Sequence, residues 1–218
     1  MRISELSAAS GVPLPTVKYY LREGLLPAGE STARNQAEYG AEHLARLRLV
    51  RALIEVGGLS VAGARDVLAA ADDPGLPLDE VMGAAHAAIS RRSAPTRLEP
   101  DWSQARAAVA ALVEQRGWRV DPDSPALDQA ADAAAAVLAA DMPELVPLID
   151  VYFDIVEDMA RKEVGAVLSM GSPDQIVRGV VIGTVLGEAL FDALRLLAHQ
   201  DVSIKLLHPA EPARPGPA

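Results

Sequence analysis

The segment GVPLPTVKYYLREGLLP, residues 11–27, fixes both ends of a short helix and leaves the chain around it little freedom. Pro15 suits the first turn of a helix, where a missing N–H has no consequence, and Gly24 suits the left-handed residue that ends one. Before this segment, apolar residues at helical spacing run from Ile3 towards Gly11. Two short helices joined by a tight turn are the pattern of a helix-turn-helix.

The second of these helices has two chemically different faces. Val17, Tyr20 and Leu21 follow the i, i+3, i+4 spacing of an inward apolar face. The polar groups elsewhere on the helix are Thr16, Lys18, Tyr19 and Arg22. Such side chains donate hydrogen bonds to phosphate oxygens and base edges, and the N-terminal end of this helix enters the major groove in such motifs. The alternative is an ordinary helical hairpin with a solvated face.

The rest of the chain indicates a mainly α protein, because alanine is abundant and is the best helix former. Residues 25–39 are too irregular for a helix and are expected to form a loop or small hairpin. Helical periodicity resumes after Gly40, and breaks at 72–79 and 93–100 mark connectors. Four helical segments are expected beyond them, at about 101–117, 124–140, 143–170 and 173–200.

Charge divides the chain into two unlike halves. The net charge is −10, which argues against nucleic acid for the chain as a whole. Residues 1–53, however, hold seven Lys and Arg against five Glu, a net charge of +2. The whole excess of acidic groups lies in residues 73–218. Contact with DNA is therefore expected from the N-terminal part alone.

Several classes of function are excluded by residues that are lacking. The sequence has no cysteine and four scattered histidines, so neither a thiolate site nor a metal site is expected. It has no nucleophile–base pair and no phosphate-binding loop, and an enzyme or a cofactor is not expected. It has no apolar run of signal-peptide or membrane-spanning length, which predicts a cytoplasmic protein without membrane contact.

The order of these motifs resembles the MerR family of transcription regulators. The matching fragments are ISEL (3–6), SGV (10–12), TVKYY (16–20), EGLLP (23–27), Tyr39 and VGGLSV (56–61). The resemblance covers about residues 1–70, with gaps only between residues 28 and 38. It implies a winged helix-turn-helix domain at the N-terminus, followed here by an all-α C-terminal domain.

The resemblance also implies which residues contact DNA. They are Thr16, Lys18, Tyr19, Tyr20 and Arg22 on the recognition helix. Lys18 stands where the family usually has an arginine, and Tyr20 has the alternative role of a core aromatic. The family's wing arginine is absent, since Ala37 stands at its position, and Arg34 and Gln36 are the candidates to replace it.

As a function, the resemblance implies a regulator that binds a palindromic promoter as a homodimer and acts on RNA polymerase. The family dimerises through the helix after the DNA-binding domain, here LDEVMGAAHAAISRR (78–92). That segment could equally be an intramolecular packing helix, and the long C-terminal helices are the other candidate interface. The alternative function is a protein-interaction or ligand-sequestering module whose helix-turn-helix no longer binds DNA.

The C-terminal half weakly resembles the ligand-binding domain of TetR-type regulators. Gly179, Gly183 and Gly187 form a ridge that lets another helix approach. A small organic effector is expected there, and its candidate pocket residues are Trp102, Trp118, Tyr152, Phe153, Met159 and Phe191; ordinary core is the alternative. An acidic cluster of Asp150, Asp154, Glu157 and Asp158 is expected to be a solvated face. The expected divisions are 1–72 (DNA binding), 73–100 (connection and dimerisation), 101–205 (effector binding or dimerisation) and 206–218 (a disordered tail).

Overall fold

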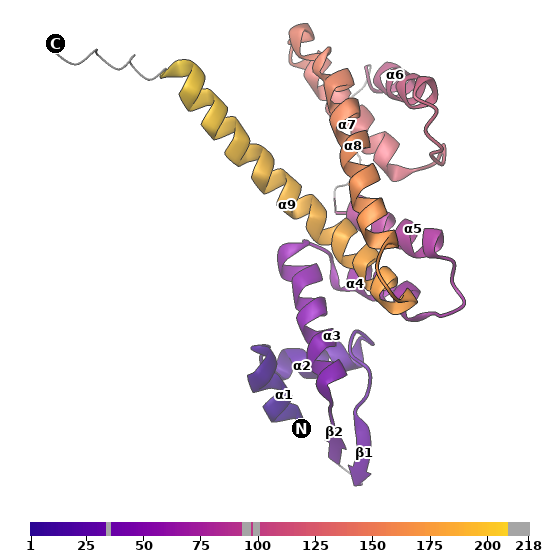
Figure 1. Ribbon diagram of the computed structural model, residues 1–218, viewed down its shortest axis with the longest axis vertical. Helices are drawn as coiled ribbons and strands as arrows, with labels where there is room; N and C mark the ends of the chain where they lie inside the picture. The colour runs from indigo at the N-terminus through magenta and orange to yellow at the C-terminus, as the bar shows by residue number, and fades with distance from the viewer. Residues whose placement is uncertain (34–35, 93–96, 98–100, 209–218) are drawn as a thin grey trace, which may run out of the picture.

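The computed structural model describes residues 1–33, 36–92, 97 and 101–208, and within these the chain is mainly α-helical (Figure 1). The N-terminal elements are α1 (Ile3–Ser10), α2 (Leu14–Arg22), β1 (Glu30–Ala33), β2 (Gln36–Glu38), α3 (Ala41–Arg51), the π-helix η1 (Ala52–Val56) and α4 (Val61–Asp72). The C-terminal elements are α5 (Leu78–Ser90), α6 (Trp102–Gln115), α7 (Pro125–Ala139), the short 3-10 helix η2 (Pro143–Leu145), α8 (Leu148–Leu168) and α9 (Pro173–Leu207). The predicted mainly α fold with a helix-turn-helix is confirmed.

Local sequence signals fix the ends of several helices. Gly11 and Gly24 have φ of +70° and +76°, the left-handed conformation that glycine adopts without strain. The Ser60 hydroxyl accepts a hydrogen bond from the amide of Gly63 at 3.0 Å, which caps α4. Ser172 caps α9 in the same way, and Pro173 occupies its first position.

The expected loop or hairpin is an antiparallel hairpin, β1–β2, which projects from the helix-turn-helix (Figure 1). Glu30 pairs with Glu38 and Ser31 with Ala37, and the register then shifts before Ala33 pairs with Gln36. A shift of this kind bends a ribbon locally. The hairpin is therefore a short wing held beside α1 and α2.

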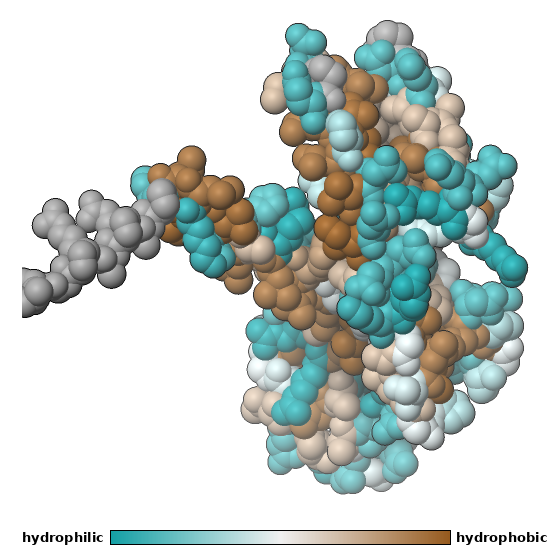
Figure 2. Space-filling model, turned by 45° about the horizontal axis from the view of Figure 1, so that its top comes forward, coloured by the Kyte–Doolittle hydropathy of each residue, from teal (hydrophilic) through white to brown (hydrophobic). Residues whose placement is uncertain are grey.

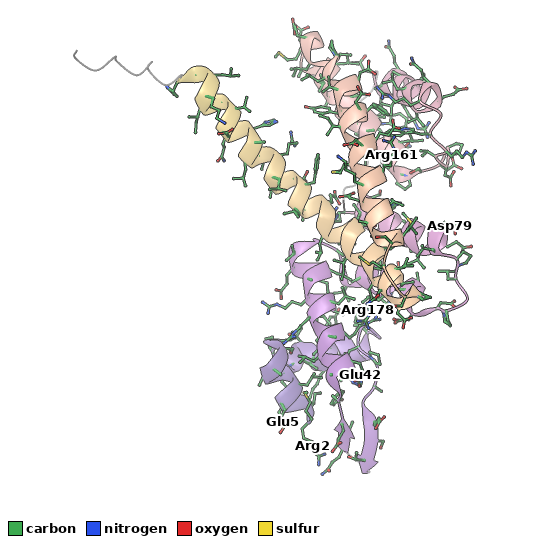
Figure 3. All side chains as sticks on the ribbon, in the orientation of Figure 1. Arg2, Glu5, Glu42, Asp79, Arg161 and Arg178 are labelled. Atoms are coloured by element: carbon green, nitrogen blue, oxygen red, sulfur yellow. The ribbon has the colours of Figure 1, made fainter. Side chains whose placement is uncertain are left out.

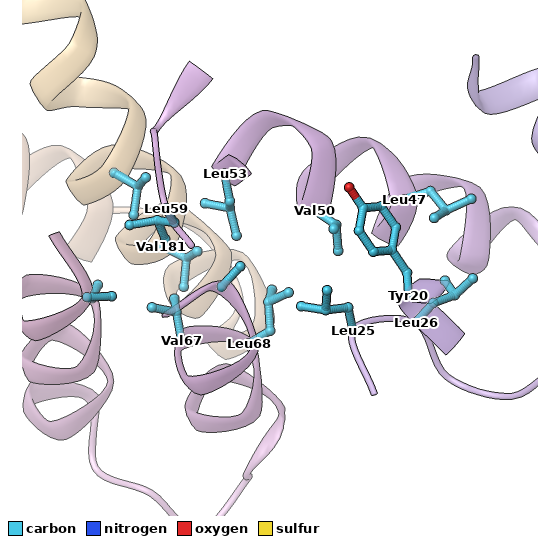
Figure 4. Close-up of a cluster of buried hydrophobic side chains, with 14 of the residues drawn as sticks. Tyr20, Leu25, Leu26, Leu47, Val50, Leu53, Leu59, Val67, Leu68 and Val181 are labelled. Atoms are coloured by element: carbon cyan, nitrogen blue, oxygen red, sulfur yellow. The ribbon is translucent and has the colours of Figure 1, made fainter. Parts of the chain in front are cut away.

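One hydrophobic core joins α1, α2, α3 and η1 to α4, α5 and α9 (Figure 4). Val181 and Val185 of α9 are fully buried in the same cluster as Leu53 and Leu68. A smaller cluster of Val109, Val113 and Leu127 holds α6 and α7 together and reaches α8. The N-terminal half of α9 thus packs in the same core as the helix-turn-helix, although the sequence analysis assigned it to the segment 101–205.

Helix α5, the segment expected to dimerise, packs within the chain. Val81, Ala85 and Ala88 are buried against α4 and α9 in the main core. Its apolar face is therefore already covered, and the intramolecular alternative is the one that the structure favours.

The C-terminal part of α9 projects away from the body of the protein (Figure 1). Its large apolar side chains are more than half exposed: Leu190, Leu194, Leu196, Leu197, Val202, Ile204, Leu206 and Leu207. Figure 2 shows them as brown patches on the projecting arm, with a further brown face on α8. The helix continues through residues 206 and 207, which the sequence had assigned to the tail; residues 209–218 lie outside the described residues.

Gly57, at the end of η1, allows α9 to pack closely against the N-terminal helices. A Cβ atom there would overlap Cγ1 of Val185 and lie 2.7 Å from the carbonyl oxygen of Leu53. We expect Gly57→Ala to lower the free energy of unfolding by about 1–3 kcal/mol, as overpacking does. Urea denaturation followed by circular dichroism measures this change.

The matched control is Gly83→Ala in α5, where an added Cβ meets no atom within 4 Å. Because alanine is the better helix former, this variant should gain about 0.5–1 kcal/mol. Equal stability of Gly57→Ala and the unmodified chain would show that this contact is not tight in solution.

Candidate nucleic-acid interface

Helix α2 presents a polar face next to the buried one. Val17 lies in the core, whereas Lys18 and Arg22 are exposed and Thr16 and Tyr19 are half-buried. Lys18 has no ion-pair partner among the described residues. Its ammonium group is therefore available to a phosphate without first breaking a bond.

Arg22 and Tyr19 form one surface rather than two separate contacts. The Arg22 guanidinium carbon lies 5.2 Å from the centre of the Tyr19 ring, within the range of a cation–π interaction. Nε of Arg22 is also 3.6 Å from a carboxylate oxygen of Glu23, an exposed pair of little energetic weight. The stacking orders the guanidinium while leaving most of it exposed.

Tyr20 belongs to the core. Its side chain is only 7% exposed, beside Leu47 and Val50 (Figure 4). Burial raises the pKa of its hydroxyl, and the nearby Glu55 carboxylate raises it further. The ring centre lies 6.0 Å from that of Tyr19. The geometry therefore favours Tyr20 as the support beneath Tyr19, and the DNA-facing role rests on the other residues of α2.

The wing is anchored at its base by residues that the sequence did not single out for this role. The backbones of Met1 and Tyr39 exchange hydrogen bonds of 2.9 Å in both directions. The Tyr39 ring packs edge-on against His43 with centres 5.1 Å apart, and Nδ1 of His43 accepts the amide of Gly40 at 3.1 Å. At the tip, Gln36 is exposed. Arg34 lies outside the described residues, so its contact with DNA stays a prediction.

Two other cations of the N-terminal part, Arg46 and Arg51, form ion pairs within the protein. Both terminal nitrogens of Arg46 bond to Asp72, at 2.9 and 2.6 Å, and Arg51 bonds to Glu55 at 2.6 Å. Arg2 lies at the start of α1, where its amide donates to Glu5 (Figure 3). Among the described residues of 1–53, the cations without an ion pair are Arg2, Lys18 and Arg48, and of these only Lys18 lies on α2.

The residues predicted to line one effector pocket do not lie together in the structure. Met159 and Phe191 line an open groove of about 430 Å³ between α5, α8 and α9. Trp118, Tyr152 and Phe153 line a second cavity of about 430 Å³ between α6, α7 and α8. Trp102 lines neither of these two cavities. The guanidinium of Arg97 lies 5.0 Å from its ring, and the Trp102 indole N–H is buried without a described hydrogen-bond partner.

The acidic cluster on α8 is neutralised by neighbouring cations. Arg116 pairs with both Asp150 and Asp154, and its hydrogen bond to Asp154 raises the pKa of the guanidinium. Arg161 (Figure 3) pairs with Glu157 at 2.8 Å. Lys162 pairs with Asp158 at 2.7 Å and lowers the pKa of that carboxyl. A cation site in this cluster is therefore not favoured.

The described part of the chain holds no group of three or more acidic or histidine side chains arranged for a metal ion. In the same residues, no helix is both long and apolar enough to cross a membrane. The resemblance of the C-terminal half to TetR-type domains stays a prediction.

Residues 1–71 match the family model described as MerR HTH family regulatory protein. A regulator described as an HTH-type ZntR homolog, from Haemophilus influenzae, is 38% identical over 50 residues, which are 23% of this chain and 37% of that protein's length. The crystal structure described as that of a transcriptional regulator, SCO5550 of Streptomyces coelicolor A3(2), is 33% identical. Its similarity covers 94% of this chain and 97% of that one, with a TM-score of 0.63. On the pattern of α1, α2 and the wing, and on these matches, the chain belongs to the MerR family of transcriptional regulators.

Proposed function

We propose that the protein regulates transcription by binding a palindromic promoter as a homodimer, without catalysing a reaction. The observation that supports this proposal is the surface of α2, where the Arg22 guanidinium stacks on Tyr19 and Lys18 is exposed, beside a buried Tyr20. In this arrangement α2 enters the major groove and the β1–β2 wing follows the adjacent backbone. RNA polymerase at the same promoter is the partner that the family implies.

The second copy is proposed to bind the free half of α9. Leu190, Leu194, Leu197 and Ile204, here called the α9 stripe, lie on one face because they follow offsets of 4, 7 and 14 residues. The opposite face carries Asp192, Arg195, His199 and Ser203, with Leu206 as an apolar residue among them. Asp201 interrupts the stripe but is paired with Lys205. An amphipathic helix with an uncovered apolar face is typical of a helix–helix interface.

A net charge of +2 on residues 1–53 is small for binding DNA with one copy of the chain, and a dimer compensates for this. Two copies double the number of phosphate contacts and place two recognition helices against two half-sites. The long arm of α9 is proposed to hold the two domains at a fixed separation. A small organic effector in the C-terminal helices would change that separation and so the affinity for DNA.

The salt dependence of DNA binding tests the role of Lys18. A binding duplex is first selected from a random pool, and fluorescence anisotropy then gives the affinity at several KCl concentrations. We expect Lys18→Ala to reduce the slope of log affinity against log salt by about 1 per chain, or about 2 per dimer, because each lysine releases counterions from one phosphate. Lys162→Ala, whose ammonium pairs with Asp158 on α8, is the control and should leave the slope unchanged. An unchanged slope in Lys18→Ala would remove this residue from the interface.

A further inference from the structure

Arg92, just after the end of α5, joins three parts of the chain through one guanidinium group. Its Nε donates to the carbonyl oxygen of Ile89 in α5 at 3.2 Å, and its Nη1 donates to the carbonyl oxygen of Gly57 at 2.6 Å. Its Nη2 donates to the Glu188 carboxylate of α9. The Arg92 side chain is 25% exposed, so its neighbours cover most of it. Each nitrogen of the planar fork is therefore engaged, with a different segment of the chain.

The same guanidinium covers the loop of residues 57–60, which connects η1 to α4. Gly58 has a φ of +67°, and Cδ and Nη1 of Arg92 each lie 3.6 Å from the position that a Cβ of Gly58 would take. Gly57 ends η1, the π-helix that continues α3, and Ser60 caps α4. The hydrogen bond to the Gly57 carbonyl therefore ties α9 to the point where the N-terminal helices turn.

Arg92 and the apolar packing have different effects on α9. Val185 packs against Gly57 in the main core, and such hydrophobic contacts hold two helices together without fixing a direction. Hydrogen bonds weaken steeply when they bend, and the donors of a guanidinium lie in one rigid plane. Glu188 stands just before the projecting part of α9, where the large apolar side chains from Leu190 onward are exposed. Arg92 therefore fixes the angle at which this part leaves the N-terminal helices.

The projecting part of α9 is a lever on this angle. Residues 188–207 form continuous helix, which at 1.5 Å per residue is on the order of 30 Å long. A change of about 10° at Arg92 moves the far end by about 5 Å, which is more than the roughly 3.4 Å between successive base pairs of DNA. A small loss of rigidity at Arg92 is therefore large on the scale of a DNA site.

We propose that Arg92 is a positioning residue that sets the half-site spacing recognised by the dimer. Gly57 and Glu188 hold its guanidinium, and the α9 stripe carries the partner copy at the other end of the lever. Without the Arg92 fork, each recognition helix still binds its own half-site, but the pair accepts a wider range of spacings. The inference rests on the proposed function, since it requires a dimer on two half-sites.

Duplexes that carry the selected half-sites, with the spacer lengthened or shortened one base pair at a time, test this role. Fluorescence anisotropy of the full-length protein gives the affinity for each duplex. We expect the unmodified protein to lose affinity at least about 10-fold when the spacer changes by one base pair. In Arg92→Gln this loss should fall to about 3-fold or less, while the affinity for a duplex with a single half-site stays unchanged.

Glu188→Gln is a second variant, which should fold because Glu188 is exposed. It keeps the bond from Arg92 to Gly57 but removes the carboxylate on α9, so its spacing preference should also broaden. The matched control is Arg91→Gln, which breaks the exposed pair of Arg91 with Asp66 on α4 and leaves α9 alone. Its spacing preference should equal that of the unmodified protein.

Hydrogen exchange without DNA provides a second measurement on the same proteins. Residues 57–60 should exchange at least about 3-fold faster in Arg92→Gln than in the unmodified protein or in Arg91→Gln. Unchanged exchange there, or a spacing preference as sharp in Glu188→Gln as in the unmodified protein, would overturn the inference and leave DNA-dependent regulation standing. Failure of the unmodified protein to bind any duplex would remove the proposed function and this role with it, so the two failures are distinguishable.

Discussion

Replacing Lys18 and Tyr19 together by alanine is expected to lower the affinity for a selected duplex by about 100-fold or more. Hydrogen bonds to charged groups contribute roughly 1.5–3 kcal/mol each. Two copies of the Lys18 contact in a dimer therefore account for about 3 kcal/mol, and 1.4 kcal/mol corresponds to a factor of ten. Loss of the Tyr19 ring adds to this, because the guanidinium of Arg22 is stacked upon it. Fluorescence anisotropy at fixed salt measures the change.

The control carries the same two substitutions elsewhere: Lys162→Ala with Tyr152→Ala on α8, where both side chains are exposed and distant from α2. It should bind DNA as the unmodified chain does. Lys18→Arg should retain binding, since a guanidinium also neutralises phosphate. Unchanged affinity in the Lys18–Tyr19 double variant would move the DNA-contacting surface away from α2.

Charged substitutions in the α9 stripe are expected to separate the two copies. Burial of a leucine contributes about 1.5–3 kcal/mol. Leu194→Glu with Leu197→Glu removes four buried leucines from a dimer, so we expect the dimer to weaken by at least about 6 kcal/mol, or roughly 10⁴-fold in dissociation constant. Sedimentation equilibrium should then give the mass of one chain, 22.9 kDa. DNA affinity should fall with it, because a single half-site remains.

The matched control places the same charges on the opposite face of the same helix, as His199→Glu with Ser203→Glu. Since both faces are exposed in one chain, neither variant should lose intramolecular contacts, and thermal melts should show equal stability. A dimer that persists unchanged in the Leu194–Leu197 variant would place the interface elsewhere, with the exposed apolar face of α8 as the next candidate.

Sequence predicts the local features of this fold well. Gly11, Gly24, Ser60 and Ser172 mark helix ends through backbone conformation and capping, which depend on a few neighbouring residues. The apolar face of α2 is predicted by its spacing for the same reason. Tyr20 could be assigned to that face, but a burial of 93% follows only from the packing of α3 against it.

The arrangement of the long helices could not be predicted in the same way. Both α5 and α9 carry apolar faces, and sequence alone does not say which is covered within the chain. Val185 packs against Gly57, and Val181 lies in the same hydrophobic core. The N-terminal half of α9 therefore packs against the N-terminal domain, and the rest of the helix projects from the body of the protein. Choices of this kind depend on contacts between residues far apart in the chain.

The position of the effector site also could not be predicted from the sequence, because it too depends on contacts between distant residues. Scarce aromatic residues suggested one pocket, but they line two cavities, and Trp102 belongs to neither. The glycine ridge was visible as a four-residue repeat and indeed faces α8.

Footprinting of the full-length protein on duplexes selected from a random pool, and on the DNA upstream of its own gene, tests DNA-dependent regulation most directly. We expect protection of two symmetric half-sites, each covering one major groove, with two chains bound per duplex. No protection of any duplex at low salt, with the chain folded and dimeric, would contradict a DNA-binding role. Such a result would favour an interaction or ligand-sequestering module.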